Sequence, residues 1–230
     1  MHVEPLEKLP RSLREFLSHY AMIVLSILTA LVLEQVAVGI EHRHEGARAK
    51  EEIEQEIATN RQAVHASLGL TQANLQKWKG LFQRTAAAVS QDRSTSVELV
   101  ATLREAGQNF TDSLPPLKTT AWDAALSDHS VNYLSHADLV HFSEVYASQR
   151  LFSQGMWDVL RDSAARDLSA ISVAIALGKP DPKATVATLG GRLETVGIIE
   201  SQLSQLEQVL SAKSGDTMTP LTGPASTASR

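Results

Sequence analysis

Histidines and carboxylates form the first pattern in this sequence that could carry chemistry. Glu41-x-x-His44 has the spacing used by di-iron helical bundles, and Asp138-x-x-His141 is an imperfect second copy. A di-iron site needs two Glu-x-x-His pairs and two further glutamates that face one interior. Here one pair carries Asp, and the other pair stands among charged residues. We therefore predict solvated histidines, with no bound metal and no cofactor.

A second pattern holds the residue types of nucleophilic catalysis. Ser127-Asp128-His129-Ser130 contains a nucleophile, a base and an acid, but triad members converge from separate elements, so adjacency has little meaning. The chain has no G-x-S-x-G elbow and no cysteine nucleophile. Gly190-Gly191-Arg192 follows no strand, so it predicts close helix packing and not phosphate binding. These observations predict a protein that is not an enzyme.

Large aromatic residues are the remaining candidates for a site. We expect Trp78, Trp122 and Trp157 to lie in the core or at an interface, because aromatic side chains bury large apolar areas. An alternative is a cleft between helices, lined by Trp122, Tyr146 or Trp157, that binds a ligand. Trp78, Trp122, Tyr146 and Trp157 are therefore the predicted ligand or interface residues.

The composition limits the classes of protein that remain. The chain has 230 residues, 43% of them hydrophobic, which is enough for a folded core. Its net charge of −5, with no basic stripe, argues against nucleic-acid binding. The absence of cysteine excludes disulfides and thiolate zinc sites.

One segment near the N-terminus is long and apolar enough to cross a membrane. Phe16 to Leu33 contains 18 residues without a charged side chain, and as a helix it would rise about 27 Å, close to the thickness of the hydrocarbon core. When the segment is extended to Ile40, Glu34 and Gln35 fall inside it. A carboxylate at the bilayer centre costs several kcal/mol, so we expect Glu34 near the interface. We predict a single-pass protein.

Three interpretations of this segment compete: an uncleaved signal anchor, a signal peptide cleaved near Ala37-Val38-Gly39, and a buried helix of a soluble protein. The leader is long for a cleaved signal peptide, and together with Glu34 it favours the anchor. Basic residues tie at three on each side of the segment, so orientation follows the usual cytoplasmic placement of a short N-terminal leader. We therefore predict an inner (cytoplasmic) membrane protein with most of the chain in the periplasm.

Helical spacing dominates the rest of the chain. From Ile53 to Val89 a stripe recurs every 3.6 residues on average, with only Asn60 and Thr71 polar, as expected for a straight amphipathic helix. Thr95-x-x-Glu98 and Ser135-x-x-Asp138 resemble capping boxes, and Asp181-Pro182 predicts the start of a last helix. In the block that follows Ser135, the apolar positions at helical spacing include Leu151.

The predicted fold is all-α. A transmembrane helix continues into an antiparallel bundle of four to six helices. The predicted boundaries are a leader at 1–15, the transmembrane helix and interface at 16–40, the bundle at 41–212, and a disordered tail at 213–230 that is rich in Ser, Thr, Pro and Gly.

The chain resembles a broad group of uncharacterised bacterial single-pass membrane proteins with a helical extramembrane domain of unknown function. Residues 119–126 (TTAWDAAL), 132–134 (NYL) and 142–146 (FSEVY) carry the resemblance, together with the basic leader and the charged helix after the apolar segment. It covers roughly residues 10–150. It departs at Val36 and Val38, where such proteins commonly carry Trp. The resemblance implies an anchor and a helical domain, and no activity.

The expected function is a membrane-anchored, non-enzymatic interaction or scaffold module. Its expected partners are the lipid bilayer and either another protein or further copies of the chain, and no nucleic acid. The alternative is a membrane-anchored ligand-binding or sensory bundle.

Overall fold

A computed structural model describes residues 13–108 and 114–214, and every regular element in these ranges is helical. The predicted leader up to residue 12 and the predicted tail from residue 215 lie outside the described residues. The elements are, in chain order, α1 (Leu13–Ser90), α2 (Ser96–Gln108), α3 (Thr120–Ser127), the 3-10 helix η1 (Ser130–Tyr133), α4 (His136–Leu177) and α5 (Pro182–Ser211). The all-α prediction and the long first helix are confirmed.

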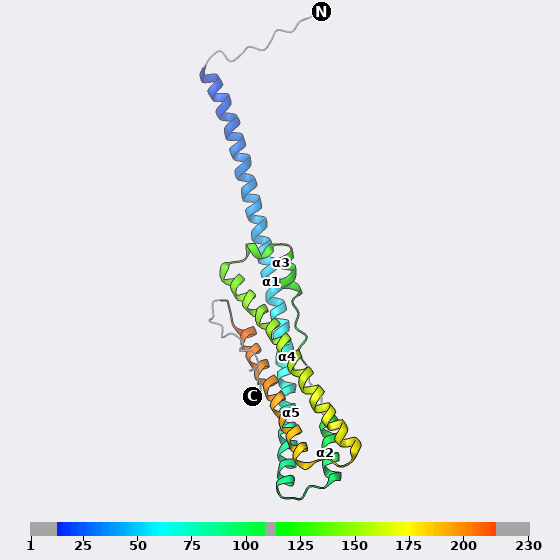
Figure 1. The fold of residues 1–230 in the computed structure, drawn as a ribbon. Helices are drawn as coiled ribbons and strands as arrows, with labels where there is room; N and C mark the ends of the chain where they lie inside the picture. The colour runs from blue at the N-terminus through cyan, green and yellow to red at the C-terminus, as the bar shows by residue number, and fades with distance from the viewer. Residues whose placement is uncertain (1–12, 109–113, 215–230) are drawn as a thin grey trace, which may run out of the picture.

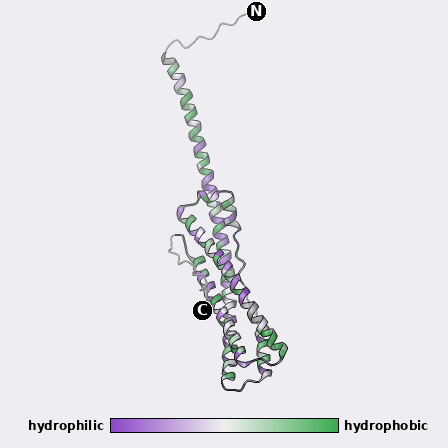
Figure 2. Ribbon diagram, viewed as in Figure 1, coloured by the Kyte–Doolittle hydropathy of each residue, from purple (hydrophilic) through white to green (hydrophobic). Residues whose placement is uncertain are grey.

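The first helix, α1, is one unbroken element of 78 residues. Its first part, Phe16–Ile40, stands clear of the bundle and is exposed along its whole length; we call it the apolar segment (Figure 1). The most apolar 18 residues have a mean hydropathy of 2.2 and are not buried by any part of the described chain. Figure 2 shows the hydrophobic residues concentrated in this projecting part. The interpretation as a buried helix of a soluble fold is therefore not supported.

Three long helices form the bundle. In Figure 1, α1 and α4 run away from the apolar segment, and α5 returns between the same two ends. The backbone of α5 lies close to those of both α1 and α4, whereas α1 and α4 approach each other less closely. The bundle is antiparallel between α1 and α5 and between α4 and α5. It is parallel between α1 and α4, because the segment containing α2 and α3 carries the chain back to the first end.

Local signals define the helix ends. The Thr95 amide and hydroxyl both donate to Glu98 Oε2 at 2.9 Å, which forms the predicted capping box. At the start of α5, Asp181 accepts from the amides of Lys183 and Ala184, and Pro182 occupies the first turn. The left-handed Gly178, with φ of 63°, ends α4.

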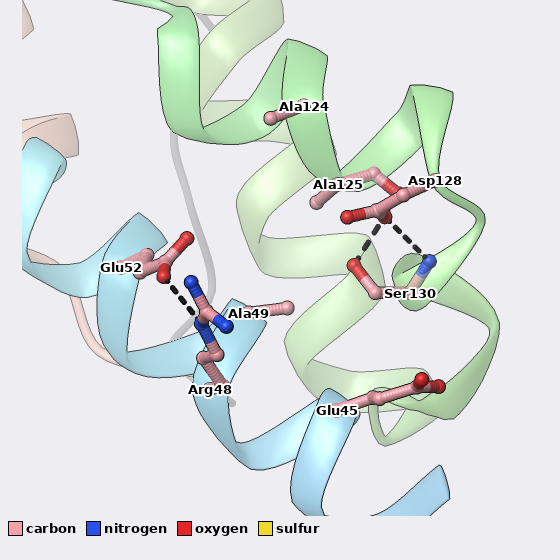
Figure 3. A pocket seen from close by; sticks show the side chains of 8 residues that line it. All are labelled: Glu45, Arg48, Ala49, Glu52, Ala124, Ala125, Asp128 and Ser130. Carbon is pink, nitrogen blue, oxygen red and sulfur yellow. Dashed lines mark hydrogen bonds and ion pairs between the residues drawn. The ribbon is translucent and has the colours of Figure 1, made fainter.

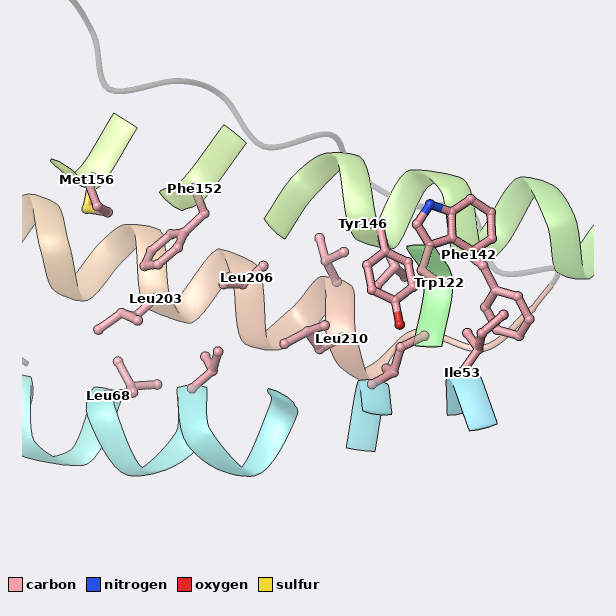
Figure 4. Packing of buried hydrophobic residues seen from close by; sticks show 14 of the residues in the cluster. Ile53, Leu68, Trp122, Phe142, Tyr146, Phe152, Met156, Leu203, Leu206 and Leu210 are labelled. Atoms are coloured by element: carbon pink, nitrogen blue, oxygen red, sulfur yellow. The ribbon is translucent and has the colours of Figure 1, made fainter. Parts of the chain in front are cut away.

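Two hydrophobic clusters form the core. The larger one lies nearer the apolar segment and joins residues of α1, α3, α4 and α5, including Ile53, Trp122, Tyr146 and Leu206 (Figure 4). The smaller one lies at the far end and includes Trp78, Leu103 and Leu189. The stripe predicted on α1 faces this core over both clusters.

Two details of the sequence-based packing need correction or refinement. Leu151 fits the helical spacing of α4 but is exposed, because α5 covers only one side of that helix and the neighbouring Phe152 occupies the core position. A Cβ added at Gly190 would lie 3.3 Å from the Phe82 ring, as close packing predicts. The next residue, Gly191, has nothing within 4 Å of such a Cβ.

Candidate functional site

The candidate site is the structure that surrounds α1 where it leaves the apolar segment. We call α3 and η1 together the collar, residues 120–133. Both elements pack on α1 at the end of the bundle nearest the apolar segment (Figure 1). Gly46 permits this contact, since a Cβ at that position would lie 2.6 Å from the backbone oxygen of Tyr133. The collar therefore rests directly on the helix backbone.

An aromatic stack extends the collar toward the apolar segment. The rings of Tyr133 and His42 lie 4.1 Å apart between centroids, with planes only 15° apart. Tyr133 remains 39% exposed, so the stack lies at the surface. It places a tyrosine two residues beyond the end of the apolar segment, which the sequence alone did not indicate.

A buried carboxylate on α1 joins the collar to α4. Glu56 accepts a hydrogen bond from the Tyr146 hydroxyl at 2.7 Å and one from the Ala121 amide at 3.0 Å. The second bond caps the first turn of α3, whose own N-cap residue Thr119 makes no side-chain capping bond. Burial raises the pKa of the Tyr146 phenol, and the hydrogen bond to Glu56 raises it further. The phenol therefore stays protonated and donates.

An amide network lies one turn farther along α1. Asn60 Nδ2 donates to the Lys118 carbonyl at 2.7 Å and to Gln149 Oε1 at 3.0 Å, and the Lys118 amide donates to Asn60 Oδ1 at 2.9 Å. This paired geometry holds the extended chain before α3 against α1 and α4. Asn60 is the polar interruption in the apolar stripe, so its role explains the irregularity seen in the sequence.

An ion pair joins α1 to the start of α4. Lys50 Nζ lies 2.9 Å from both carboxylate oxygens of Asp138, which also accepts from the Ser135 hydroxyl at 2.7 Å. Burial opposes ionisation of Asp138, but the hydrogen bonds from Ser135 and Lys50 outweigh it and hold the pKa of this carboxyl below its ordinary value. The same hydrogen bond raises the pKa of Lys50. Asp138 is thus a structural anchor for α4.

A small pocket lies between α1 and the collar (Figure 3). Its volume is about 260 Å³, and Arg48 and Glu52 approach it from α1 while Asp128 and Ser130 approach it from the collar. Arg48 Nε binds Glu52 at 2.8 Å, and Asp128 accepts from the Ser130 amide at 2.9 Å. Of the four charged residues that line the pocket, Arg48 and Glu52 are thus paired with each other, and Asp128 is bound within its own turn.

The four predicted site residues do not converge. Trp122 and Tyr146 stack at 5.3 Å between centroids and fill the core between α3 and α4 (Figure 4). Trp78 lies in the far cluster, where the Arg192 guanidinium sits 5.7 Å from its ring centroid. Trp157 is 66% exposed on α4, which excludes the core among its two predicted places, and a place at an interface stays a prediction.

The motifs considered for catalysis are also dispersed. In the described part of the chain, no group of three or more His, Asp or Glu side chains is arranged to hold a metal ion. Asp138 is engaged by Lys50, and His141 is buried beside Phe142. Asp128 and Ser130 bind each other within the turn between α3 and η1, where His129 has a φ of 65°. The segment 127–130 therefore serves as a turn.

Several residues that build the site were not predicted from the sequence. Glu56 and Gln149 are both buried, and each binds a group more than fifty residues away in the chain. Glu56 lies in a run of glutamates that resembles a solvated helix face, so its burial had no local signal.

No protein-family model, no curated protein and no solved structure matches this chain.

Proposed function

We propose that the chain is a membrane-anchored, non-enzymatic interaction module. The observation that carries the proposal is the continuity of α1, whose exposed apolar segment and packed bundle segment belong to the same helix. An exposed helix that is apolar on all sides needs a nonpolar surrounding. The bundle is then held at a fixed distance from the membrane by the helix itself.

The proposed interaction surface is on α4. Trp157 and Leu151 are both exposed on this helix, and large exposed aromatic residues are enriched in protein interfaces. The partner is a second copy of the chain or another protein. We also propose the inner membrane as the location, with the bundle on the periplasmic side.

Thiol crosslinking in membranes tests this function. The chain has no cysteine, so Trp157→Cys provides a single reactive site on α4. Val97→Cys on α2 is the matched control, since Val97 is also exposed but lies at the far end of the bundle. With a maleimide that carries a photoreactive benzophenone, which attaches to any protein in contact, we expect a crosslinked product from Trp157→Cys and none from Val97→Cys. Monomer alone from both variants would contradict the interaction function.

A second candidate is a ligand-binding or sensory bundle. It is favoured by hollows at both ends of the bundle: the pocket of about 260 Å³ beside the collar, and a groove of about 570 Å³ lined by residues of α1 and α2, including Arg84 and Glu98. The cleft predicted at Trp122 and Tyr146 is occupied by their own rings. Thermal-shift screening would identify a compound that raises the melting temperature of the protein. Loss of that shift in Arg84→Ala alone would place the ligand in the groove, and loss in Arg48→Ala alone would place it in the pocket.

A further inference from the structure

The position of the collar along α1 sets its distance from the apolar segment. Tyr133 stacks on His42, which follows Ile40 by two residues, or about 3 Å of helix rise. The Tyr133 backbone contacts Gly46, about 9 Å beyond Ile40. Because α1 is unbroken here, this spacing is rigid. The collar therefore lies immediately beyond the last apolar residue.

The end of the apolar segment also lacks any cover in the described chain. Val36, Val38 and Ile40 are 54%, 39% and 51% exposed. If the hydrocarbon ended at Leu33, these three side chains would stand in water. The 20 residues from Ala21 to Ile40 would instead rise about 30 Å, which matches the hydrocarbon thickness.

Tyrosines mark both ends of this 20-residue stretch. Tyr20 immediately precedes it and is exposed, and Tyr133 is brought to its other end by the collar. Tyrosine is enriched where hydrocarbon meets headgroups, because its ring is apolar and its hydroxyl is polar. The collar thus supplies a tyrosine at an end of the stretch where α1 itself carries no Tyr or Trp, since none occurs between Tyr20 and Trp78.

We propose that the collar rests in the lipid headgroup layer, with Tyr133 as its interfacial residue and Ala21–Ile40 as the part of α1 in the hydrocarbon. This inference rests on the membrane anchoring proposed above. The headgroup layer on each side is about 5–8 Å thick, so from Ile40 it extends past His42 and ends just short of Gly46. Glu34 then lies about 9 Å inside the edge at Ile40, where its carboxylate carries part of the several-kcal/mol cost of a charge in hydrocarbon.

The charges near the collar indicate which lipids it fits. Over residues 41–52 of α1, three cations stand among four carboxylates, and the collar adds two more carboxylates, Asp123 and Asp128. Such a mixed surface has no strong preference for anionic lipid, since attraction to anionic membranes requires a cluster of basic residues. A bilayer of zwitterionic phospholipid is therefore sufficient for contact.

Thiol accessibility tests the depth of α1. The full chain is placed in vesicles of phosphatidylcholine and phosphatidylethanolamine with single cysteines at Ala30, Val38 or Ala47. We expect Val38→Cys to react with an aqueous maleimide roughly tenfold more slowly than Ala47→Cys, because only Val38 lies in hydrocarbon. Equal reaction rates at Val38→Cys and Ala47→Cys, with Ala30→Cys protected, would overturn the placement of Ala21–Ile40 in the hydrocarbon without contradicting the membrane anchor. A reactive Ala30→Cys would overturn the anchor itself and the inference with it.

Fluorescence quenching tests the contact of the collar. A fluorophore on Asn132→Cys is compared with one on Arg93→Cys at the far end of the bundle, in vesicles with a nitroxide on the lipid headgroup. We expect roughly threefold stronger quenching at Asn132, and about a twofold loss of it in Tyr133→Ala but not in Tyr133→Trp. Equal quenching at the two sites would overturn the contact. Unchanged quenching in Tyr133→Ala would overturn the role of Tyr133.

Discussion

Two stretches of α1 have the same backbone conformation and opposite surroundings. Phe16–Ile40 is exposed on every side, whereas from Gly46 onward one side of the helix is buried, with the collar, α2 and α5 packed against it. The packed stretch is apolar along one stripe and the exposed stretch is apolar all round. Helical conformation alone therefore does not distinguish the two stretches. The distribution of apolar side chains around the helix determines whether a stretch packs against one side of a bundle or needs a nonpolar surrounding on all sides.

The two stretches also differ in the hydrogen-bond partners of some of their polar side chains. In the packed stretch, the buried Glu56 and Asn60 each bind groups from two other segments of the chain. In the exposed stretch, Ser26 and Thr29 bond to carbonyls of their own helix four residues earlier. Such back-bonding satisfies hydroxyl groups where no water is present. Ser26 and Thr29 therefore need no hydrogen-bond partner outside their own helix.

The largest contrast is expected from isoleucine truncation. Ile53→Ala removes a fully buried side chain and should lower the free energy of unfolding of the bundle by about 2–5 kcal/mol. Ile27→Ala, in the exposed stretch, should leave bundle unfolding in detergent within about 0.5 kcal/mol of the parent. Urea unfolding followed by circular dichroism measures both. A large effect of Ile27→Ala would show that the apolar segment packs on the bundle.

A somewhat smaller loss is expected at the buried carboxylate. Glu56→Ala leaves the Tyr146 hydroxyl and the Ala121 amide without their acceptor, at a cost of about 2–4 kcal/mol. Glu54→Ala is the control, since its side chain is exposed and should change stability by less than about 0.5 kcal/mol. Equal stabilities of the two variants would remove Glu56 as the anchor of the collar.

Alanine substitutions of Gly46 and Gly39, which lie on either side of the end of the apolar segment, are expected to change stability in opposite directions. Gly46→Ala forces a Cβ against Tyr133 and should destabilise the bundle by about 1–3 kcal/mol. Gly39→Ala meets nothing within 4 Å and should stabilise the helix by about 0.5–1 kcal/mol. Melting temperatures of the two variants in the same detergent provide the comparison. A stabilising Gly46→Ala would mean that the collar is not seated on α1.

The smallest effect depends on pH. Because the folded state lowers the pKa of Asp138, its contribution is present above the carboxyl pKa of the unfolded chain, about 4, and is lost as pH falls through the folded value. Asp138→Asn should therefore cost about 1 kcal/mol at pH 7 and less at pH 3. The exposed pair at Asp158 supplies the control, with little cost expected from Asp158→Asn at either pH. An Asp138→Asn cost that grew on acidification would contradict the assigned ion pair.

Sequence patterns predicted the features that depend on neighbours along the chain. The period of α1 and the caps at Thr95, Ser135 and Asp181 each involve residues within a few positions, and the structure confirms them. The stripe also included Asn60 correctly, although its partners were unknown.

The features that failed or were missed depend on distant segments. Glu56 and Tyr146 are ninety positions apart, and only the return of the chain through α2 and α3 brings α4 beside α1. Trp157 follows the buried Met156, and which of the two faces the core depends on where α5 lies. The contact between Tyr133 and Gly46 could not be predicted locally, because a glycine within a helix does not indicate which distant residue packs against it.

Membrane anchoring by the apolar segment is tested most directly with one thiol at the far end of the bundle. Arg93→Cys would be treated in intact bacterial cells with a membrane-impermeant maleimide, followed by lysis and sedimentation of membranes. The proposed function predicts labelling before lysis of a full-length chain that sediments with the membranes. A labelled product shortened near Gly39, or a full-length chain in the soluble fraction, would contradict the anchor. Labelling only after lysis would contradict the periplasmic location of the bundle.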